Sequence, residues 1–249
     1  MSVHPRAALG FERAAGAYER GRPDYPAEAV EWLRDRLELE PGRAVVDLAA
    51  GTGKLTRLLL PTGARVLAVE PVAAMRGTLA EAVPSAEIVD GTAEDMPLAD
   101  GAADAVTVAQ AFHWFSTAEA LAEIHRVLRP DGGLALVWNR RDPDDPLQVA
   151  LDRIISRHRG DVPTHQSGRW KSAFETTDLF GPLEEHAVAH HQELDRRGLV
   201  DRVMSTSVMA ALPDAERRAA VADIEELAAS ETEPIRISYT TQIHLCFRR

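Results

Sequence analysis

A short run of small residues, Asp47-Leu48-Ala49-Ala50-Gly51-Thr52-Gly53, is the part of the sequence best suited to hold a ligand. It follows an apolar stretch typical of a buried strand and precedes a helical segment that begins at Lys54. Small side chains let a ligand approach the backbone, and the unpaired N–H groups at the start of a helix can bind its polar atoms. Close packing of strand against helix, without any ligand, is the alternative.

Three kinds of ligand use a turn of this type. A phosphate-binding loop requires Gly, four residues and then Gly-Lys-Ser/Thr, and Leu48 and Leu55 occupy two of its required positions. A dinucleotide-binding turn requires G-x-G-x-x-G, and Thr56 stands where the third glycine is needed. The pattern acidic-x-Gly-x-Gly-x-Gly, seen in the S-adenosylmethionine methyltransferases, fits with one departure, Ala49 at the first glycine.

Two later segments carry further candidate ligand contacts. Glu70 ends the second predicted strand, where a carboxylate can accept hydrogen bonds from both hydroxyls of a ribose, although a solvated strand end is the alternative. The loop 91–98 follows the third predicted strand and is placed to line an adenine pocket. Met75 and Met96 offer soft apolar contact to a purine, and core filling is the alternative for each.

The loop after the fourth predicted strand, residues 110–115, contains His113 and Trp114. Parallel sheets bind ligands at the carboxyl ends of their strands, where this loop lies. The ordinary pKa of a histidine suits His113 to act as a general base, and the aromatic cluster suits a sulfonium or an apolar acceptor. The alternative is that both residues only form the pocket wall.

Arg140 follows the fifth predicted strand and could bind a carboxylate or phosphate through two parallel hydrogen bonds. A surface arginine paired with Asp142 or Asp144 is the alternative. Three histidines lie on a later predicted strand, His186, His190 and His191, but no nearby spacing completes a metal site. We therefore expect no metal.

The elements that position these residues alternate along the chain. Short apolar runs typical of buried strands lie at 44–49, 65–69, 87–89, 103–109 and 133–138, with helical segments between them. Such alternation predicts βαβ units and a parallel sheet covered on both faces. With two further predicted strands at 183–194 and 235–247, we expect a Rossmann-like, seven-stranded, mostly parallel sheet in a three-layer α/β/α fold.

We expect residues 1–249 to form a single domain. Its core would comprise residues 27–138 and 182–249, with an N-terminal lid at 1–26 and a cap insertion at 139–181. The insertion contains Asp-Pro steps, an Arg- and His-rich helix and a polar stretch, and late insertions in such folds commonly cover the ligand edge. The sequence therefore predicts a helical cap on that edge.

Charge and cysteine content limit the possible partners. The formal net charge of −11 argues against non-specific binding to nucleic acid or to an anionic membrane. A single cysteine, Cys246, excludes an intrachain disulfide and a Cys-based zinc cluster. No apolar stretch is long enough to span a bilayer, and residues 1–6 lack the apolar core of a signal peptide. We expect a cytoplasmic protein with a small-molecule substrate, either monomeric or homodimeric.

In their order and spacing along the chain, these segments resemble the class I S-adenosylmethionine-dependent methyltransferases, in particular the type 11 group that includes trans-aconitate methyltransferase-like proteins. The resemblance covers roughly residues 44 to 138. One fairly specific part, His125-Arg126-Val127-Leu128-Arg129-Pro130-Asp131-Gly132-Gly133, is similar to the way the family begins its fifth strand. Tyr18 and the stretch 22–26 resemble a subgroup feature.

The resemblance implies S-adenosylmethionine as cofactor and S-adenosylhomocysteine as product. Many relatives carry Asp where this chain has Thr92, a departure that affects the contact to the adenine amino group. The implied site residues are Asp47, Ala49, Gly51 and Gly53 around the methionine part and ribose; Glu70 on the ribose hydroxyls, with Pro71 and Met75 nearby; Thr92, Ala93 and Glu94 at the adenine; Gln110 beside the methionine part; Tyr18 or Arg22 at the cofactor carboxylate; His113 in catalysis; and Trp114 and Arg140 at the substrate.

These observations predict methyl transfer to a small-molecule acceptor through oxygen, nitrogen or carbon, with a carboxylic acid favoured. A carboxylate needs no base, whereas a phenol or an ammonium must lose a proton. A noncatalytic S-adenosylmethionine-binding protein is an alternative, indicated by Ala49 and Thr92. A Rossmann NAD(P)-dependent oxidoreductase is another, which the missing third glycine disfavours.

Overall fold

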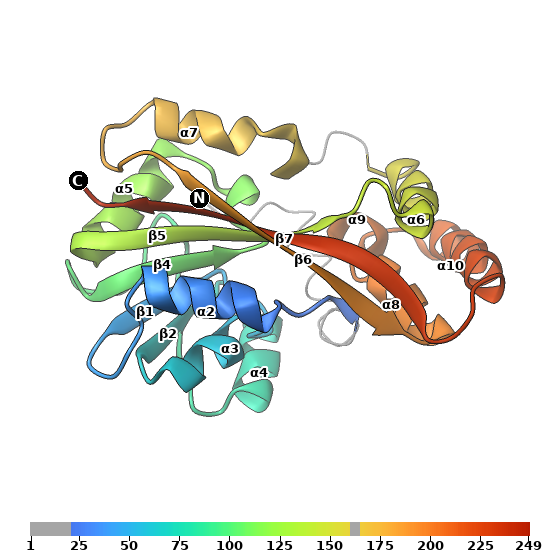
Figure 1. Cartoon of the computed structure of the whole chain (residues 1–249), viewed down its shortest axis with the longest axis horizontal. Helices are drawn as coiled ribbons and strands as arrows, with labels where there is room; N and C mark the ends of the chain where they lie inside the picture. The colour runs from blue at the N-terminus through green and yellow to red at the C-terminus, as the bar shows by residue number, and fades with distance from the viewer. Residues whose placement is uncertain (1–20, 160–164) are drawn as a thin grey trace.

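A computed structural model describes residues 21–159 and 165–249 of the chain. Its centre is a seven-stranded sheet in the order β3-β2-β1-β4-β5-β7-β6 (Figure 1). Neighbouring strands are parallel except for β7, which runs antiparallel to both β5 and β6. The strands are β1 Ala44–Leu48, β2 Arg65–Val69, β3 Glu87–Val89, β4 Ala103–Ala109, β5 Leu128–Arg141, β6 Glu184–Leu194 and β7 Ile235–Phe247. The predicted Rossmann-like fold is confirmed.

Helices cover both faces of the sheet because alternate residues of the inner strands are apolar on each side. In β1, Val45 packs on the side of α2 and α3, and Val46 packs on the side of α5. The helices are α2 Ala27–Arg36, α3 Thr56–Leu59, α4 Ala73–Ala82, α5 Ala118–Val127, α6 Pro146–Ser156, α7 Ser172–Glu175, α8 Arg196–Met204, α9 Ser207–Ala210 and α10 Asp214–Ala229, with short 3-10 turns at Leu60–Thr62, Phe112–Trp114, His165–Ser167 and Arg169–Lys171.

The fifth strand is longer at both ends than its apolar run predicts. Ala103 pairs with Leu128 and Ala105 pairs with Gly133, so the residues between the two partners bulge out of the ladder. This bulge is the turn that the sequence indicates, but it lies inside the strand. At the other end the polar residues 139–141 continue the ladder against β7, a pairing that hydrophobicity alone does not reveal.

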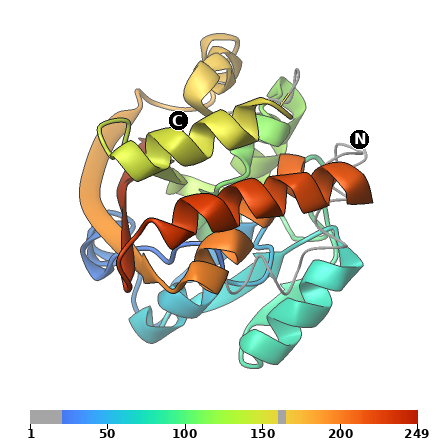
Figure 2. The same cartoon turned by 90° about the vertical axis from the view of Figure 1, so that its right-hand side faces the viewer.

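A separate apolar cluster forms beyond the carboxyl ends of the parallel strands. It joins α6, α8, α9 and α10 to the first residues of β7 (Figures 1 and 2). The pairs from Leu194 with Ile235 to His191 with Ser238 lie past the end of β5, so the β6–β7 ribbon extends into this cluster. We call these four helices and the ribbon end the helical cap.

The segment predicted as a cap insertion, 139–181, divides between two places. Its helix α6 belongs to the helical cap, whereas Trp170, Ala173 and Phe180 pack in the core cluster on the α5 face of the sheet. The predicted division into core, lid and a cap at 139–181 stays a prediction. In the structure, the helical cap is built from α6 and from helices within residues 195–234.

The strand order reverses between β1 and β4, since β2 and β3 lie on one side and β5 on the other. Open α/β sheets bind ligands outside the carboxyl ends of the strands at such a point. In this fold the helical cap stands over that edge (Figure 1). The candidate site is therefore bounded by the loops after β1 and β4 and by the cap.

Candidate active site

The turn after β1 has the backbone form that its small residues predict. Ala49, Gly51 and Gly53 all have positive φ angles, of 57°, 60° and 86°. The N–H of Ala50 donates to the carbonyl oxygen of Val69 at 3.1 Å, which fixes the turn against β2. The chain therefore leaves the sheet through three left-handed positions, a conformation that suits glycine and strains alanine.

Glu70 connects this turn to the loop after β2. Its carboxylate accepts a hydrogen bond from the N–H of Gly51 at 2.9 Å and another from the N–H of Val72 at 2.8 Å. Burial raises the pKa of Glu70, and the two backbone N–H groups and Arg76 oppose that rise. Because a carboxylate has about four acceptor positions, each oxygen retains capacity for a ligand hydroxyl.

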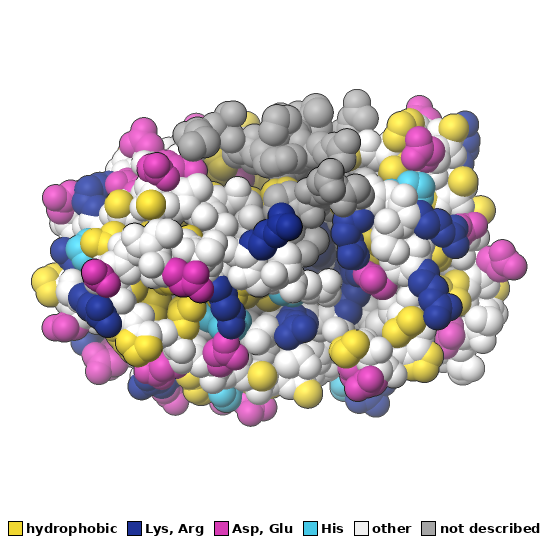
Figure 3. Space-filling model, turned by 90° about the horizontal axis from the view of Figure 1, so that it is seen from above, with side chains coloured by type: hydrophobic (Ala, Val, Ile, Leu, Met, Phe, Trp, Pro, Cys, Tyr) yellow, Lys and Arg dark blue, Asp and Glu magenta, His cyan; other side chains and the backbone are white. Residues whose placement is uncertain are grey.

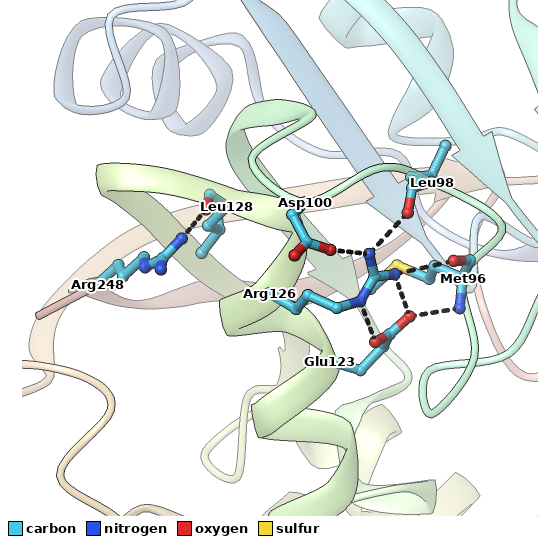
Figure 4. Close-up of polar contacts among 7 residues, drawn as sticks. All are labelled: Met96, Leu98, Asp100, Glu123, Arg126, Leu128 and Arg248. Carbon is cyan, nitrogen blue, oxygen red and sulfur yellow. Dashed lines mark hydrogen bonds and ion pairs between the residues drawn. The ribbon is translucent and has the colours of Figure 1, made fainter.

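Arg126 of α5 holds the loop that follows β3 (Figure 4). Its guanidinium donates to the carbonyl oxygens of Met96 and Leu98 at 3.1 and 2.8 Å. It also pairs with Asp100 and Glu123, each at 2.7 Å. Glu123 in turn accepts a hydrogen bond from the N–H of Met96 at 2.7 Å. The position of this loop, which carries three predicted ligand contacts, thus depends on α5.

The three predicted contacts in that loop differ in exposure. Ala93 is buried in the core, whereas Thr92 and Glu94 are partly exposed. The N–H of Thr92 donates to the carbonyl oxygen of Asp95 at 3.1 Å, which closes a tight turn around Ala93 and Glu94. On α4, Met75 is buried, and Pro71 before that helix is partly exposed.

One pocket joins the β1 and β4 loops to the N-terminal segment and the cap. Gln110 follows β4 with a φ of 61° and donates its N–H to the carbonyl oxygen of Val137 at 2.8 Å. The structure thus brings Ala49, Gln110 and Arg22 together from three distant parts of the sequence, and their roles as cofactor contacts stay predictions. The pocket is lined by Arg22, Pro23, Tyr25, Ala49, Ala50, Lys54, Leu55, Ala109, Gln110, Asn139 and Arg202. Tyr18 lies outside the described residues.

His113 lies in the 3-10 turn after β4, beside Trp114, with a distance of 5.0 Å between the ring centroids. The indole N–H of Trp138 donates to its Nδ1 at 3.4 Å, so the ring proton belongs on Nε2. Burial, with His165 and Arg22 adding to the effect, lowers the pKa of His113 to about 3. At neutral pH this histidine is a hydrogen-bond donor through Nε2, and its role as a base stays a prediction.

Comparison with known proteins decides the family. Residues 46–136 match the family model of a methyltransferase domain. An uncharacterized methyltransferase of Mycobacterium tuberculosis is 40% identical over 223 residues, which make up 90% of this chain and 87% of the relative. The chain belongs to the class I S-adenosylmethionine-dependent methyltransferases.

Two other similar proteins support this methyltransferase assignment. A solved structure of a proposed type II methyltransferase from Anaeromyxobacter dehalogenans superposes with a TM-score of 0.66 at 25% identity, covering 92% of this chain and 97% of that one. A malonyl-[acyl-carrier protein] O-methyltransferase from Pectobacterium atrosepticum is 32% identical over 153 residues, which are 61% of this chain and 60% of the relative. Family membership sets aside the oxidoreductase alternative.

Among residues 21–159 and 165–249, the methyltransferase has no group of three His, Cys, Asp or Glu side chains that could hold a metal ion. In the same ranges, no helix is both long and apolar enough to cross a membrane.

Asp47 of the methyltransferase is turned inward rather than into the pocket. The residue is 1% exposed, and its carboxylate accepts hydrogen bonds from the hydroxyls of Thr56 and Thr107 at 2.6 and 3.1 Å. These bonds fix the start of α3 against β1 and β4. Burial, opposed by the two threonines, raises the pKa of Asp47 to about 6.

This raised pKa predicts how an Asp47→Asn variant should behave. A carboxyl whose pKa is higher in the folded than in the unfolded chain destabilises the fold progressively as the pH rises from about 4 to about 6. Asparagine does not ionise and has no such cost. The free energy of unfolding of the variant, measured against that of wild type, should therefore increase by about 2 kcal/mol from pH 4 to pH 8. Urea unfolding at both pH values measures the difference, with exposed Asp35→Asn as control. If the variant and wild type differed in stability by the same amount at both pH values, Asp47 would not carry a buried charge.

Ala49 gives a second prediction, because its φ of 57° strains an alanine by about 1–2 kcal/mol. Ala49→Gly should relieve this strain, and the larger entropy of glycine in the unfolded chain should offset part of the gain. We expect a net stabilisation of about 0.5–1 kcal/mol, measured by thermal unfolding, with affinity for S-adenosylhomocysteine retained. Ala50→Gly, in the same turn at an ordinary φ, should destabilise instead. Equal effects of the two variants would argue against strain at Ala49.

Arg140, the predicted substrate contact, lies on the other face of β5 from the pocket. It is exposed, donates to the side-chain oxygen of Gln242 at 3.3 Å and lines a separate hollow with Trp138 and His165. The next residue, Arg141, points to the opposite face because side chains alternate along a strand. Asn139 and Arg141 therefore share the face on which the pocket lies.

Among the pocket residues that the sequence reasoning missed, two polar ones stand out, Asn139 and Arg202. Asn139 donates to the carbonyl oxygen of Asp24 at 3.2 Å and accepts from the hydroxyl of Thr241 at 2.6 Å, which ties the N-terminal segment to the sheet. The sequence does contain a signal that could have identified Arg202, because this residue shares the buried face of α8 with Leu199. A charge at an apolar position of a helix is typical of a functional or paired group.

Proposed function

We propose that this methyltransferase transfers the methyl group of S-adenosylmethionine to an oxygen or nitrogen atom of a small molecule, with a carboxylate favoured. The observation that carries the proposal is the shared pocket, which places the β1 turn and Gln110 opposite the cationic side chains Arg22 and Arg202. The similar malonyl-[acyl-carrier protein] O-methyltransferase supports transfer to oxygen.

The proposed cofactor site fits the residues that surround it. A Cβ built on Gly51 meets no atom within 4 Å, so the backbone there is open to a ligand. The Glu70 carboxylate beside it retains acceptor capacity for ribose hydroxyls. The remaining proposed cofactor contacts are Ala49, Pro71, Met75, Thr92, Ala93, Glu94, Gln110, Arg22 and Tyr18, with His113 and Trp114 toward the acceptor. Asp47 and Gly53 would support the β1 turn through hydrogen bonds and packing, and Arg140 faces away from this pocket.

S-adenosylmethionine supplies a methyl group already activated by a sulfonium. A lone pair of the acceptor forms the new bond to the methyl carbon while the carbon–sulfur bond breaks and its electron pair stays on sulfur. The residues of the chain have to orient the acceptor and exclude water. The low pKa of His113 supports an acceptor that needs no base, and a carboxylate meets that condition.

The test combines binding with product analysis. Calorimetry should show that the full chain binds S-adenosylhomocysteine. A cofactor carrying a deuterated methyl group should then label members of a panel of carboxylic acids, with the label released by mild base as expected for methyl esters. A folded sample that binds no S-adenosylhomocysteine would overturn the cofactor site, and labelling confined to carbon atoms would overturn the acceptor class. The trans-aconitate methyltransferase-like subgroup, the cytoplasmic location and the choice between monomer and homodimer stay predictions.

A further inference from the structure

Arg202 of α8 is a buried cation in the cap wall of the pocket. The residue is 4% exposed, and its Nε donates to the hydroxyl of Tyr239 at 2.6 Å. Its guanidinium carbon lies 5.4 Å from the centroid of the Tyr239 ring. Both contacts are to an uncharged side chain. Within residues 21–159 and 165–249, no carboxylate forms an ion pair with Arg202, although burying an unpaired charge is costly.

Two more guanidinium groups lie near Arg202. Arg22 lines the same pocket and donates to the carbonyl oxygen of Ser205, at the end of α8, at 3.3 Å. Arg141 pairs with Asp152 at 2.5 Å, and Arg159 shares the same carboxylate oxygen at 2.8 Å. Burial and repulsion from Arg202 lower the pKa of Arg141 to about 10.

The charges at this wall are therefore unbalanced in the part of the chain that the structure describes. Three arginines, Arg141, Arg159 and Arg202, lie near the single carboxylate of Asp152. Figure 3 shows Lys and Arg side chains gathered in a hollow near the middle of one face. S-adenosylmethionine adds a sulfonium and an ammonium against one carboxylate, so the bound cofactor makes the pocket still more positive.

We propose that Arg202 binds an oxyanion group of the methyl acceptor, of the carboxylate or phosphate class, in the pocket it shares with the β1 turn. The inference rests on the proposed function. The planar fork of an arginine matches an oxyanion with two parallel hydrogen bonds, and Tyr239 holds that fork by its Nε. An anionic acceptor also balances the positive charge that the arginines and the cofactor create together.

The test measures binding to the full chain saturated with S-adenosylhomocysteine. The probes are succinate, benzoate and inorganic phosphate, with succinamide and benzamide as uncharged partners, in calorimetry at fixed ionic strength. Wild type should bind at least one oxyanion and should bind it at least tenfold more tightly than an uncharged partner. The probe that binds most tightly shows whether the oxyanion group of the acceptor is a carboxylate or a phosphate.

Arg202→Gln should weaken the strongest oxyanion at least tenfold and leave affinity for S-adenosylhomocysteine within twofold. Arg197→Gln removes the same charge from an exposed position of the same helix and should change neither affinity. Tyr239→Phe should weaken the oxyanion several-fold. If Arg202→Gln does not fold, Arg202→Lys keeps the charge without the fork and should still lose affinity.

Three results would overturn the inference: equal oxyanion affinity in Arg202→Gln and wild type, no preference of wild type for any oxyanion over the amides, or loss of S-adenosylhomocysteine affinity alone in Arg202→Gln. The last would assign Arg202 to the cofactor carboxylate. Failure of the proposed function is distinguishable, because wild type would then bind no S-adenosylhomocysteine at all.

Discussion

Gly53→Ala should lower the free energy of unfolding by about 3 kcal/mol or more, a large part of the stability of a domain of this size. An added Cβ would lie 2.2 Å from Cδ1 of Leu79 and 2.9 Å from Cγ2 of Val83, both on the side of the turn that faces α4. Leu79 is fully buried, so it has little room to move. The φ of 86° adds strain. Urea unfolding and the soluble yield measure the loss.

Gly51→Ala is the matched variant two residues earlier. Its Cβ meets nothing within 4 Å, so only the strain of a φ of 60° remains, about 1–2 kcal/mol. Because the added methyl occupies space open to the cofactor, we expect S-adenosylhomocysteine to bind at least tenfold more weakly. Gly53 would then be required for packing against α4, and Gly51 would be required for binding the cofactor. A Gly53→Ala protein as stable as Gly51→Ala would contradict this division.

Glu70→Gln should weaken S-adenosylhomocysteine binding by about 10- to 100-fold, since a hydrogen bond to a charged group contributes about 1.5–3 kcal/mol. The amide replaces one acceptor oxygen with a donor, which then faces either the N–H of Gly51 or that of Val72. The turn and the proposed ribose contact are therefore both disturbed. Calorimetry at pH 8 measures the affinity.

Glu81→Gln, at an exposed position of α4, is the control for the loss of one negative charge and should bind as wild type does. Thermal unfolding without ligand shows whether Glu70→Gln remains folded. A folded Glu70→Gln protein with unchanged affinity would remove Glu70 from the proposed ribose site.

The sequence predicted the sheet well because its signals are local. The apolar runs of β1, β2, β3 and β4 end within one residue of the predicted positions, and the β1 turn carries the positive φ angles that its glycines indicate. Ala49 could be recognised as a departure, and the structure shows the strained backbone that makes it one.

The acceptor side could not be predicted in the same way, because it depends on which face of an element meets the pocket. Arg140 and Arg141 are equivalent in the sequence, and only the register of β5 with β7 separates them. Arg202 comes from a helix more than 90 residues after Gln110. Its approach to the β1 turn requires the whole β6–β7 ribbon to be in place.

That ribbon has a consequence for how new specificities arise in this fold. The β6 and β7 strands form one hydrogen-bonded unit with the sheet and continue without a break into the helical cap. A hinge at that junction would have to bend paired strands, so we expect the cap wall to be rigid relative to β5. Selectivity should then change through substitutions on α6 and α8, whose segments lie outside the span 46–136 shared with the methyltransferase family. The chain thereby separates an inherited reaction from an adjustable choice of substrate.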